Sequence, residues 1–363
     1  MARRLFWIVV ALAIISGILF RFLHVEHRML WADESWTALR ISGHYYGDLA
    51  RLFDGRRHPV AQLLELQRPT AATPMSATVI GLAREEPQHP PLFYLIDRAW
   101  TLWFGSSIAD LRVPALLFGL IAMLAVSWLC FELTGSAIIA GVGAALMAVS
   151  PFFVNYSAQA REYTLWAGCI CVCSALLLRA LRRSSALRWA AYGAAMALAL
   201  YADVLMLAVL AGHVAYVLAA RYRDRRTLCG FGLAAGAATR LFLPWLLVCI
   251  RAHAAISGDE SWTNGVYPLR LFVEKWCFNI GSVLFDAEYG NMRLLVIAVA
   301  MSLLVAYAVV RLFRDERPAL SWFVAAPRSP SRFPRCSSIY SLGRTPRPSH
   351  AILSRSGSHC SSP

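Results

Sequence analysis

Long apolar blocks with almost no internal charge are the feature that most constrains the fold of this chain. Hydrophobic residues make up 58% of the sequence, charged residues make up 15%, and the mean hydropathy is +0.53. In an ordinary soluble domain about 25% of the residues are charged. A helix crosses a hydrocarbon core of about 30 Å with about 20 apolar residues. Blocks of about this length recur, so the sequence predicts an all-α, polytopic membrane helical bundle.

The blocks predict eight spans within one domain that covers residues 1–325. The spans lie near residues 5–23, 113–131, 137–154, 163–178, 187–201, 204–220, 228–250 and 292–310. The basic residues before the first block are also typical of a signal peptide. Its apolar core is longer than the roughly 7 to 15 residues of a signal peptide, and no small-residue cleavage site follows. We therefore expect a retained first helix.

The net charge of +14 comes almost entirely from arginine, because Lys275 is the only lysine. The arginines cluster between apolar blocks, at residues 179–188 and 221–226. Such clusters are typical of cytoplasmic loops and of contact with anionic lipid. The positive charge therefore indicates how the protein is oriented in the membrane. It predicts membrane lipid, and not nucleic acid, as a partner.

The topology depends on the short apolar segment 91–104, which Asp97 and Arg98 interrupt. With a cytoplasmic N-terminus and no crossing by this segment, both arginine clusters and residues 311–314 face the cytoplasm. If the segment crosses, all of them face outward. The positive-inside rule favours the first arrangement. We therefore expect an interfacial helix at 91–104, inside a long first extracytoplasmic loop at 24–111.

A triplet of cysteines, Cys169, Cys171 and Cys173, lies inside an apolar block. Positions two apart point to different faces of a helix, which argues against a shared metal site or a disulfide. Zinc-ligand spacing is absent as well. We interpret these cysteines as small buried hydrophobic residues.

Asp33 and Glu34 form a carboxylate pair just beyond the first apolar block. Two carboxylates beside lipid are costly unless they have a partner or a function. Both are ionised near neutral pH unless burial raises their pKa values. One of them could accept a proton from a sugar hydroxyl, or the pair could hold Mg²⁺ or Mn²⁺ against a phosphate. The alternative is an exposed acidic pair favoured by a helix dipole.

His89 and Tyr94 belong to the run 89–94, in which two prolines precede the expected interfacial helix. Pro91 suits the first helical turn, and Pro90 keeps His89 extended. This arrangement predicts that His89 lies at the edge of a site. The alternative is a solvated histidine beside a simple helix start.

Arg161, Glu162 and Tyr163 end the segment 150–163, which joins two predicted spans on the outer side. A guanidinium group offers several donors suited to a phosphate, and the adjacent carboxylate could orient it or meet an acceptor. The alternative is an arginine–glutamate anchor at the membrane surface.

Arg240 lies midway through the block 228–250. An arginine in lipid is costly, so we expect it to face the bundle interior, where a lipid phosphate or Asp203 could pair with it. It could instead be an anchor if the span starts later.

The pentapeptide of residues 33–37 recurs at 259–263, and we interpret this as chance recurrence because the flanking residues differ.

Residues 326–363 are rich in Ser, Pro and Arg and contain no acidic residue. This composition cannot bury a core and predicts a disordered tail. The apolar stretch that begins at residue 319 stops abruptly at Pro327. We take this as a hypothesis of a frame shift or truncation.

The Asp33–Glu34 pair, the run 89–94, residues 111–114 and the segment 150–163 occur in an order that resembles the membrane glycosyltransferases of GT-C fold. The resemblance is to the protein-mannosyltransferase-like family 39 and its aminoarabinose-transferase relatives, over roughly residues 1–222. It implies transfer of a hexosyl or pentosyl group from a polyprenyl-phosphate donor. The acceptor would be a lipid, glycan or protein of the cell envelope, on the extracytoplasmic face of a bacterial-type inner membrane.

The resemblance implies that Asp33 is the catalytic carboxylate, that Glu34 is its neighbour in the acceptor or metal site, and that Arg161 contacts the donor phosphate. The other predicted substrate-binding residues are His89, Tyr94, Glu162, Tyr163 and Arg240. A cofactor other than a divalent cation is not indicated. The competing hypotheses are a transporter or flippase of a lipid-linked or small polar substrate, and an inactive truncated remnant.

Overall fold

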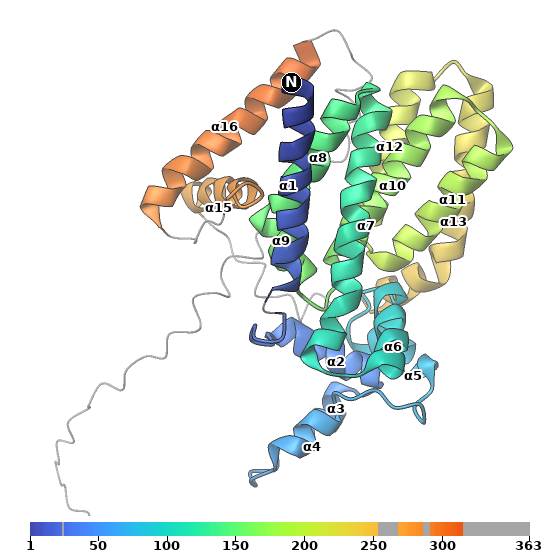
Figure 1. Cartoon of the computed structure of the whole chain (residues 1–363). Helices are drawn as coiled ribbons and strands as arrows, with labels where there is room; N and C mark the ends of the chain where they lie inside the picture. Colours follow the sequence, from blue (N-terminus) through green and yellow to red (C-terminus); the bar gives the residue numbers. More distant parts are fainter. Residues whose placement is uncertain (24, 253–267, 286–290, 315–363) are drawn as a thin grey trace, which may run out of the picture.

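The computed structural model describes residues 1–23, 25–252, 268–285 and 291–314 (Figure 1). The described residues form helices and contain no strand, so the predicted all-α bundle is confirmed. The predicted tail at 326–363, the apolar stretch from residue 319 and the repeated pentapeptide at 259–263 lie outside the described residues.

Most of the apolar blocks form the long helices of the bundle. Their bounds are α1 Ala2–Phe22, α7 Ile108–Thr134, α8 Ala137–Val149, α9 Pro151–Ser157, α10 Tyr163–Arg182, α11 Ala186–Ala202, α12 Met206–Arg221, α13 Arg225–Arg251, α15 Leu269–Gly281 and α16 Met292–Arg314. By length and composition α1, α7, α10 and α13 can each cross a membrane. The pair α8 and α9, bent by 62°, adds a fifth candidate. Several apolar helices of this kind support a multi-pass membrane protein, while the full set of eight spans stays a prediction.

The helices pack against neighbours in the chain and also against helices further apart in the sequence. The helix α7 contacts α8 and α10, α10 contacts α11, and α11 contacts α13, while α1 packs chiefly on α8. Figure 1 shows these helices running side by side, with α1 at the margin of the group. The main buried core of the described residues lies between α10, α11, α12 and α13, with the start of α7 at its edge.

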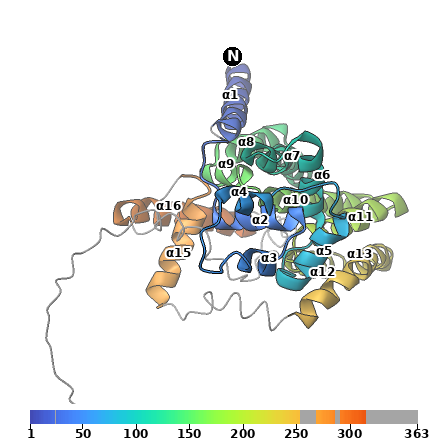
Figure 2. The same ribbon diagram turned by 90° about the horizontal axis from the view of Figure 1, so that it is seen from below.

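One end of the bundle is covered by the short helices of the first loop. They are α2 Ala32–Ser42, α3 Tyr46–Ala50, α4 Val60–Glu65, α5 Met75–Glu85 and α6 Leu92–Phe104. We call this the loop end, and Figure 2 views the molecule from it. At the opposite end α1, α8, α11 and α13 begin, and α7, α10 and α12 end (Figure 1). We call it the arginine end for its arginines, which are Arg3, Arg4, Arg182, Arg183, Arg188, Arg221, Arg223, Arg225 and Arg226.

The helix α6 corresponds to the segment expected to lie in the interface. One of its faces is buried in the protein, while Trp103 and Phe104 at its end are 85% and 62% exposed. The buried Arg98 donates to the Thr78 hydroxyl (2.9 Å) and the Thr73 carbonyl (2.6 Å), which ties α6 to α5 and the preceding turn. A helix with one protein-facing side and large aromatic residues on its exposed end suits a membrane surface.

The contact between α1 and α8 depends on a glycine. A Cβ atom at Gly17 would collide with the Ala148 carbonyl, so only glycine allows this approach. The buried Arg21 then donates to the carbonyls of Ala148 (2.6 Å) and Met147 (3.0 Å). Those carbonyls belong to the end of α8, where the chain bends into α9 and leaves the helical hydrogen bonds incomplete.

We expect Gly17→Leu to destabilise the protein by about 1–3 kcal/mol, because the larger side chain forces α1 away from α8. Gly236→Leu in α13 is the matched control, since no atom lies within 4 Å of a Cβ built there. The control should be neutral or slightly stabilising, by up to about 1 kcal/mol of helix propensity. Thermal unfolding in detergent measures both effects. Equal midpoints for the two variants would contradict this account of the contact.

Candidate active site

The carboxylate pair lies in the first turn of α2, as expected for acids at a helix N-terminus. Glu34 accepts a hydrogen bond from the Trp31 amide (3.4 Å), which satisfies one backbone donor at the start of the helix. Neither residue is an exposed surface charge, because Glu34 is 1% exposed and Asp33 is half-buried. The two carboxylates have different surroundings and therefore different possible roles.

Glu34 forms a buried, bidentate ion pair with Arg112 of α7. The Nε and Nη2 atoms of Arg112 donate to the Oε1 and Oε2 atoms of Glu34, both at 2.7 Å. Both side chains are 1% exposed. Arg112 also donates to the carbonyls of Val25 (2.5 Å), Arg28 (3.1 Å) and Met29 (3.2 Å). This one guanidinium group therefore fixes the segment between α1 and α2 as well as the start of α2.

A further hydrogen bond joins the carboxylate pair to the Arg161–Glu162 corner. The Ala160 amide donates to Glu34 Oε1 at 2.9 Å. The residues on either side of this bond, Asp33 and Arg161, are close enough to shift each other's pKa values. Two motifs far apart in the sequence therefore meet at the loop end.

His89, Arg161 and Glu162 form a compact charged cluster beside this bond. His89 Nδ1 lies 2.8 Å from Glu162 Oε1, and His89 Nε2 lies 3.0 Å from Arg161 Nη2. Arginine can only donate, so a neutral His89 with its proton on Nδ1 satisfies both contacts. The Tyr94 hydroxyl donates to the other Glu162 oxygen at 3.4 Å. His89 therefore contacts Glu162 with one ring nitrogen and Arg161 with the other.

Glu162 is ionised although it is only 2% exposed. Burial favours the neutral acid, but Arg161 and His89 oppose it and lower the pKa of Glu162 to about 2. The guanidinium group of Arg161 also lies over the rings of Tyr94 and Tyr163, at 6.0 Å and 5.8 Å from their centroids. These contacts hold the arginine in one orientation.

Asp33 differs from Glu34 in having a carboxylate that no described residue hydrogen-bonds or pairs with. Burial raises its pKa above the ordinary value, while Arg161 and His89 act in the opposite direction. A half-buried carboxylate with a raised pKa and open coordination is suited to accept a proton from a bound group.

The sequence prediction did not place Arg112 and Asp203 in this neighbourhood, and it named Asp203 only as a possible partner of Arg240, which is exposed on α13. Arg112 belongs to the run 111–114. Its position near the start of an apolar block is the sequence feature that could have identified it as a paired residue. Asp203, between α11 and α12, accepts from the Leu205 amide at 2.7 Å. Burial raises the pKa of Asp203 to about 7, and the nearby Glu162 adds to this shift. Asp203 therefore titrates near neutral pH beside the cluster.

Arg240 is the predicted site residue that lies elsewhere. Its side chain is exposed on α13, so the expectation that it faces the bundle interior is wrong. The buried face of this part of α13 carries Ala238, Phe242 and Trp245. Positions two residues from Ala238 and Phe242 lie on the opposite side of a helix, which is where Arg240 lies.

The described residues contain no group of three or more His, Cys, Asp or Glu side chains that could hold a metal ion. Both oxygens of Glu34 already accept hydrogen bonds from Arg112. A cation shared by Asp33 and Glu34 would have to displace this guanidinium group. The pair as it is arranged does not fit the divalent-cation site that the sequence left open.

We expect Glu162→Gln to destabilise the protein by about 3–5 kcal/mol at neutral pH, because it leaves the buried Arg161 without its charge partner. The low pKa of Glu162 also predicts that the parental protein loses stability as the pH falls from about 4.5 towards about 2. The variant should lack this component of the acid dependence. The exposed Glu26→Gln is the control. Unfolding curves between pH 2 and pH 7 test this, and parallel curves for all three proteins would contradict it.

We expect Arg112→Met and Glu34→Gln each to lower the unfolding free energy by about 3–5 kcal/mol, because each leaves a buried group unsatisfied. The double variant should be less destabilised than the sum of the two, since neither charge is then left alone. Arg51→Ala is the control, as its ion-paired side chain is 82% exposed. Strictly additive losses would show that the two side chains do not interact.

Comparison with known proteins agrees with the predicted resemblance. Residues 88–247 match the family model of dolichyl-phosphate-mannose-protein mannosyltransferase. This segment includes His89, Arg112 and the Arg161–Glu162 corner, while Asp33 and Glu34 precede it. The chain has no match among curated proteins or among solved structures.

The match supports a membrane glycosyltransferase of the GT-C type, with a lipid-linked sugar as the class of donor. The resemblance predicted from the motifs is therefore confirmed: through residues 88–247 the chain matches the dolichyl-phosphate-mannose-protein mannosyltransferase family.

Proposed function

We propose that this protein transfers a sugar from a polyprenyl-phosphate donor to a hydroxyl group of a cell-envelope acceptor at the loop end of the bundle. The observation that carries the proposal is the hydrogen bond between Ala160 and Glu34, because it sets Asp33 beside Arg161 and His89. A base and a phosphate-binding cation are thereby available to one sugar phosphate.

In the proposed reaction Asp33 accepts the proton of the acceptor hydroxyl. The acceptor oxygen forms a bond to the anomeric carbon of the sugar, and the bond between that carbon and the phosphate oxygen breaks. The electron pair leaves with the polyprenyl phosphate. The raised pKa of Asp33 supports this role, since a base is most effective when its pKa approaches the working pH.

Arg161 stabilises the charge on the departing phosphate. Its contacts with His89 and Glu162 use the Nη2 and Nε atoms. A fixed cation in a site shielded from water is more effective than a mobile one, because no reorganisation is needed during the reaction. His89 and Tyr94 act as positioning residues in this proposal, through Glu162.

Glu34 acts as a positioning residue rather than as a metal ligand. Its carboxylate is committed to Arg112 and Ala160, and residues 37–42 of α2 are buried. The adjacent Asp33 therefore has a fixed backbone. Such fixed placement of a reacting group can account for a large part of a rate enhancement.

The proposed orientation puts the loop end on the extracytoplasmic face of a bacterial-type inner membrane, with the N-terminus in the cytoplasm. The arginine end then lies at the cytoplasmic surface, as the positive-inside rule favours. A lipid-linked donor in this orientation has its phosphate at the outer surface and its chain in the bilayer. The interfacial face of α6 lies at the same level as the site.

We expect Asp33→Asn to lower sugar transfer by about 10²–10⁴-fold, the usual contribution of a general base. Thermal stability should change little, because no described residue hydrogen-bonds the Asp33 carboxylate. Asp48→Asn in the same loop is the matched control and should retain transfer. The assay uses the full-length protein in membranes that contain a radiolabelled polyprenyl-phosphate sugar. Parental turnover by a folded Asp33→Asn variant would exclude Asp33 as the base.

A further inference from the structure

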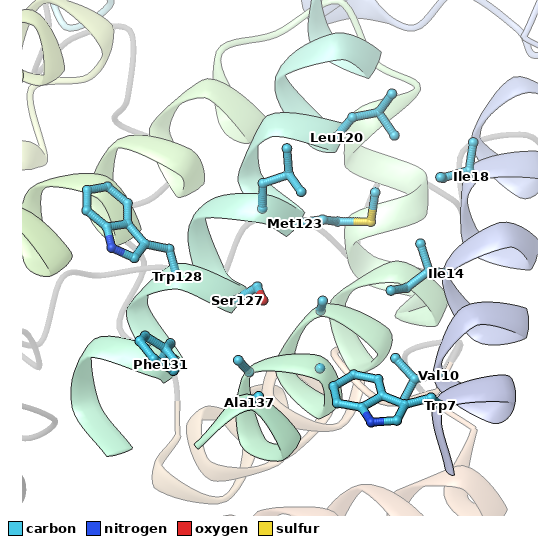
Figure 3. A pocket seen from close by; sticks show the side chains of 14 residues that line it. Trp7, Val10, Ile14, Ile18, Leu120, Met123, Ser127, Trp128, Phe131 and Ala137 are labelled. Atoms are coloured by element: carbon cyan, nitrogen blue, oxygen red, sulfur yellow. The ribbon is translucent and has the colours of Figure 1, made fainter. Parts of the chain in front are cut away.

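A groove between α1, α7 and α8 lies on the half of the bundle that faces the arginine end (Figure 3). It encloses about 710 Å³, within the range of about 300–1,000 Å³ that is usual for small-molecule sites. The groove exists because α8 separates α1 from α7 and presents small residues to the space between them. The small residues that line it are Ala137, Ala140, Gly141 and Ala144.

The length of the groove matches one leaflet of a membrane. Its lining on α1 runs from Trp7 to Ile18, and its lining on α7 runs from Leu120 to Phe131. Each stretch covers about 16 Å along the helix at 1.5 Å per residue. Half of a hydrocarbon core of about 30 Å is about 15 Å. Apart from Ser127 and the indole N–H groups of the tryptophans, the lining side chains are apolar, which suits a single hydrocarbon chain.

Basic and aromatic side chains gather where the groove reaches the arginine end. Arg3 and Arg4 are exposed and precede Trp7 on α1. On the other side Arg182 pairs with Glu132 and donates to its carbonyl at 2.8 Å, while remaining 52% exposed. Trp128 donates to the same Glu132 at 2.8 Å. Tryptophans at this level are typical of a membrane surface, and the excess of arginines attracts anionic headgroups.

We propose that this groove binds one anionic phospholipid from the leaflet at the arginine end. One acyl chain lies against α8 between α1 and α7, and the phosphate of the headgroup lies near Arg3, Arg4 and Arg182. Only the exclusion of the sugar donor as the occupant rests on the proposed function, because the phosphate site of that reaction is at the loop end. The groove and its arginines do not depend on it, and binding alone tests them.

The test is native mass spectrometry of the purified full-length protein, titrated with phosphatidylglycerol or with phosphatidylcholine. We expect saturable binding of one phosphatidylglycerol at concentrations that leave phosphatidylcholine unbound. Ser127→Phe should weaken binding about fourfold for each methylene group that the new ring displaces. Ile121→Phe on the same helix is the control, because Ile121 is 51% exposed and lies outside the groove lining.

Further variants distinguish binding of the acyl chain from binding of the headgroup. Ala137→Phe also fills the groove, and because Ala137 is exposed this variant should fold. It therefore tests whether an acyl chain occupies the groove even if Ser127→Phe does not fold. The double variant Arg3→Gln with Arg4→Gln should abolish the preference for phosphatidylglycerol over phosphatidylcholine. Binding of the acyl chain in the groove should stay intact. Arg51→Gln, in the loop at the other end, is the charge control. Equal binding of the two phospholipids by the parental protein, or unchanged binding by both groove variants, would overturn the proposal. Displacement of phosphatidylglycerol by a polyprenyl phosphate would assign the groove to the donor instead.

Discussion

The buried ion pair between Glu34 and Arg112 is the interaction on which the rest of the loop end depends. Removing two charges from water is costly, and their attraction offsets that cost only when the geometry is favourable and the remaining donors are satisfied. Here the pair is bidentate, and Arg112 also donates to carbonyls of the segment between α1 and α2. The start of α2 is thereby attached to α7, the helix at the centre of the bundle.

The same pair determines which carboxylate is available for chemistry. Glu34 has its oxygens committed to Arg112 and Ala160, while the Asp33 carboxylate has no such partner among the described residues. The pKa values of Asp33 and Glu162 move in opposite directions, since burial dominates for Asp33, whereas the Arg161 charge and the hydrogen bond from His89 together outweigh burial for Glu162. Neighbouring acids with separated pKa values are a common arrangement where one of them transfers protons and the other holds a charge in place.

The two ends of the bundle have different chemistry. The loop end combines buried ion pairs with a half-buried carboxylate, and it is covered by the short helices α2 to α6 (Figures 1 and 2). The arginine end has many exposed guanidinium groups and few acids. An apolar groove opens beside it (Figure 3). A bundle of this kind can hold a reaction at one membrane surface while the other surface anchors it to lipid headgroups.

The helices could be predicted from the sequence because the length of an apolar block and the positions of prolines and charges are local properties. The segment predicted at 91–104 became α6 at Leu92–Phe104 for this reason. The order of the motifs also indicated which residues meet, and Asp33, His89 and Arg161 do lie together.

The partner of each charged side chain was decided only by the tertiary structure. Glu34 and Arg112 are 78 residues apart, and nothing local to either residue specifies their contact. Arg240 was assigned to the interior from its depth in an apolar block, whereas the packing of α13 buries the opposite face of that helix. The sequence by itself therefore determined the helices and the chemical groups available, and the packing of those helices determined which groups are paired and which are open to a substrate. The physical reason is that burial and pairing depend on long-range contacts, while helix formation depends on near neighbours.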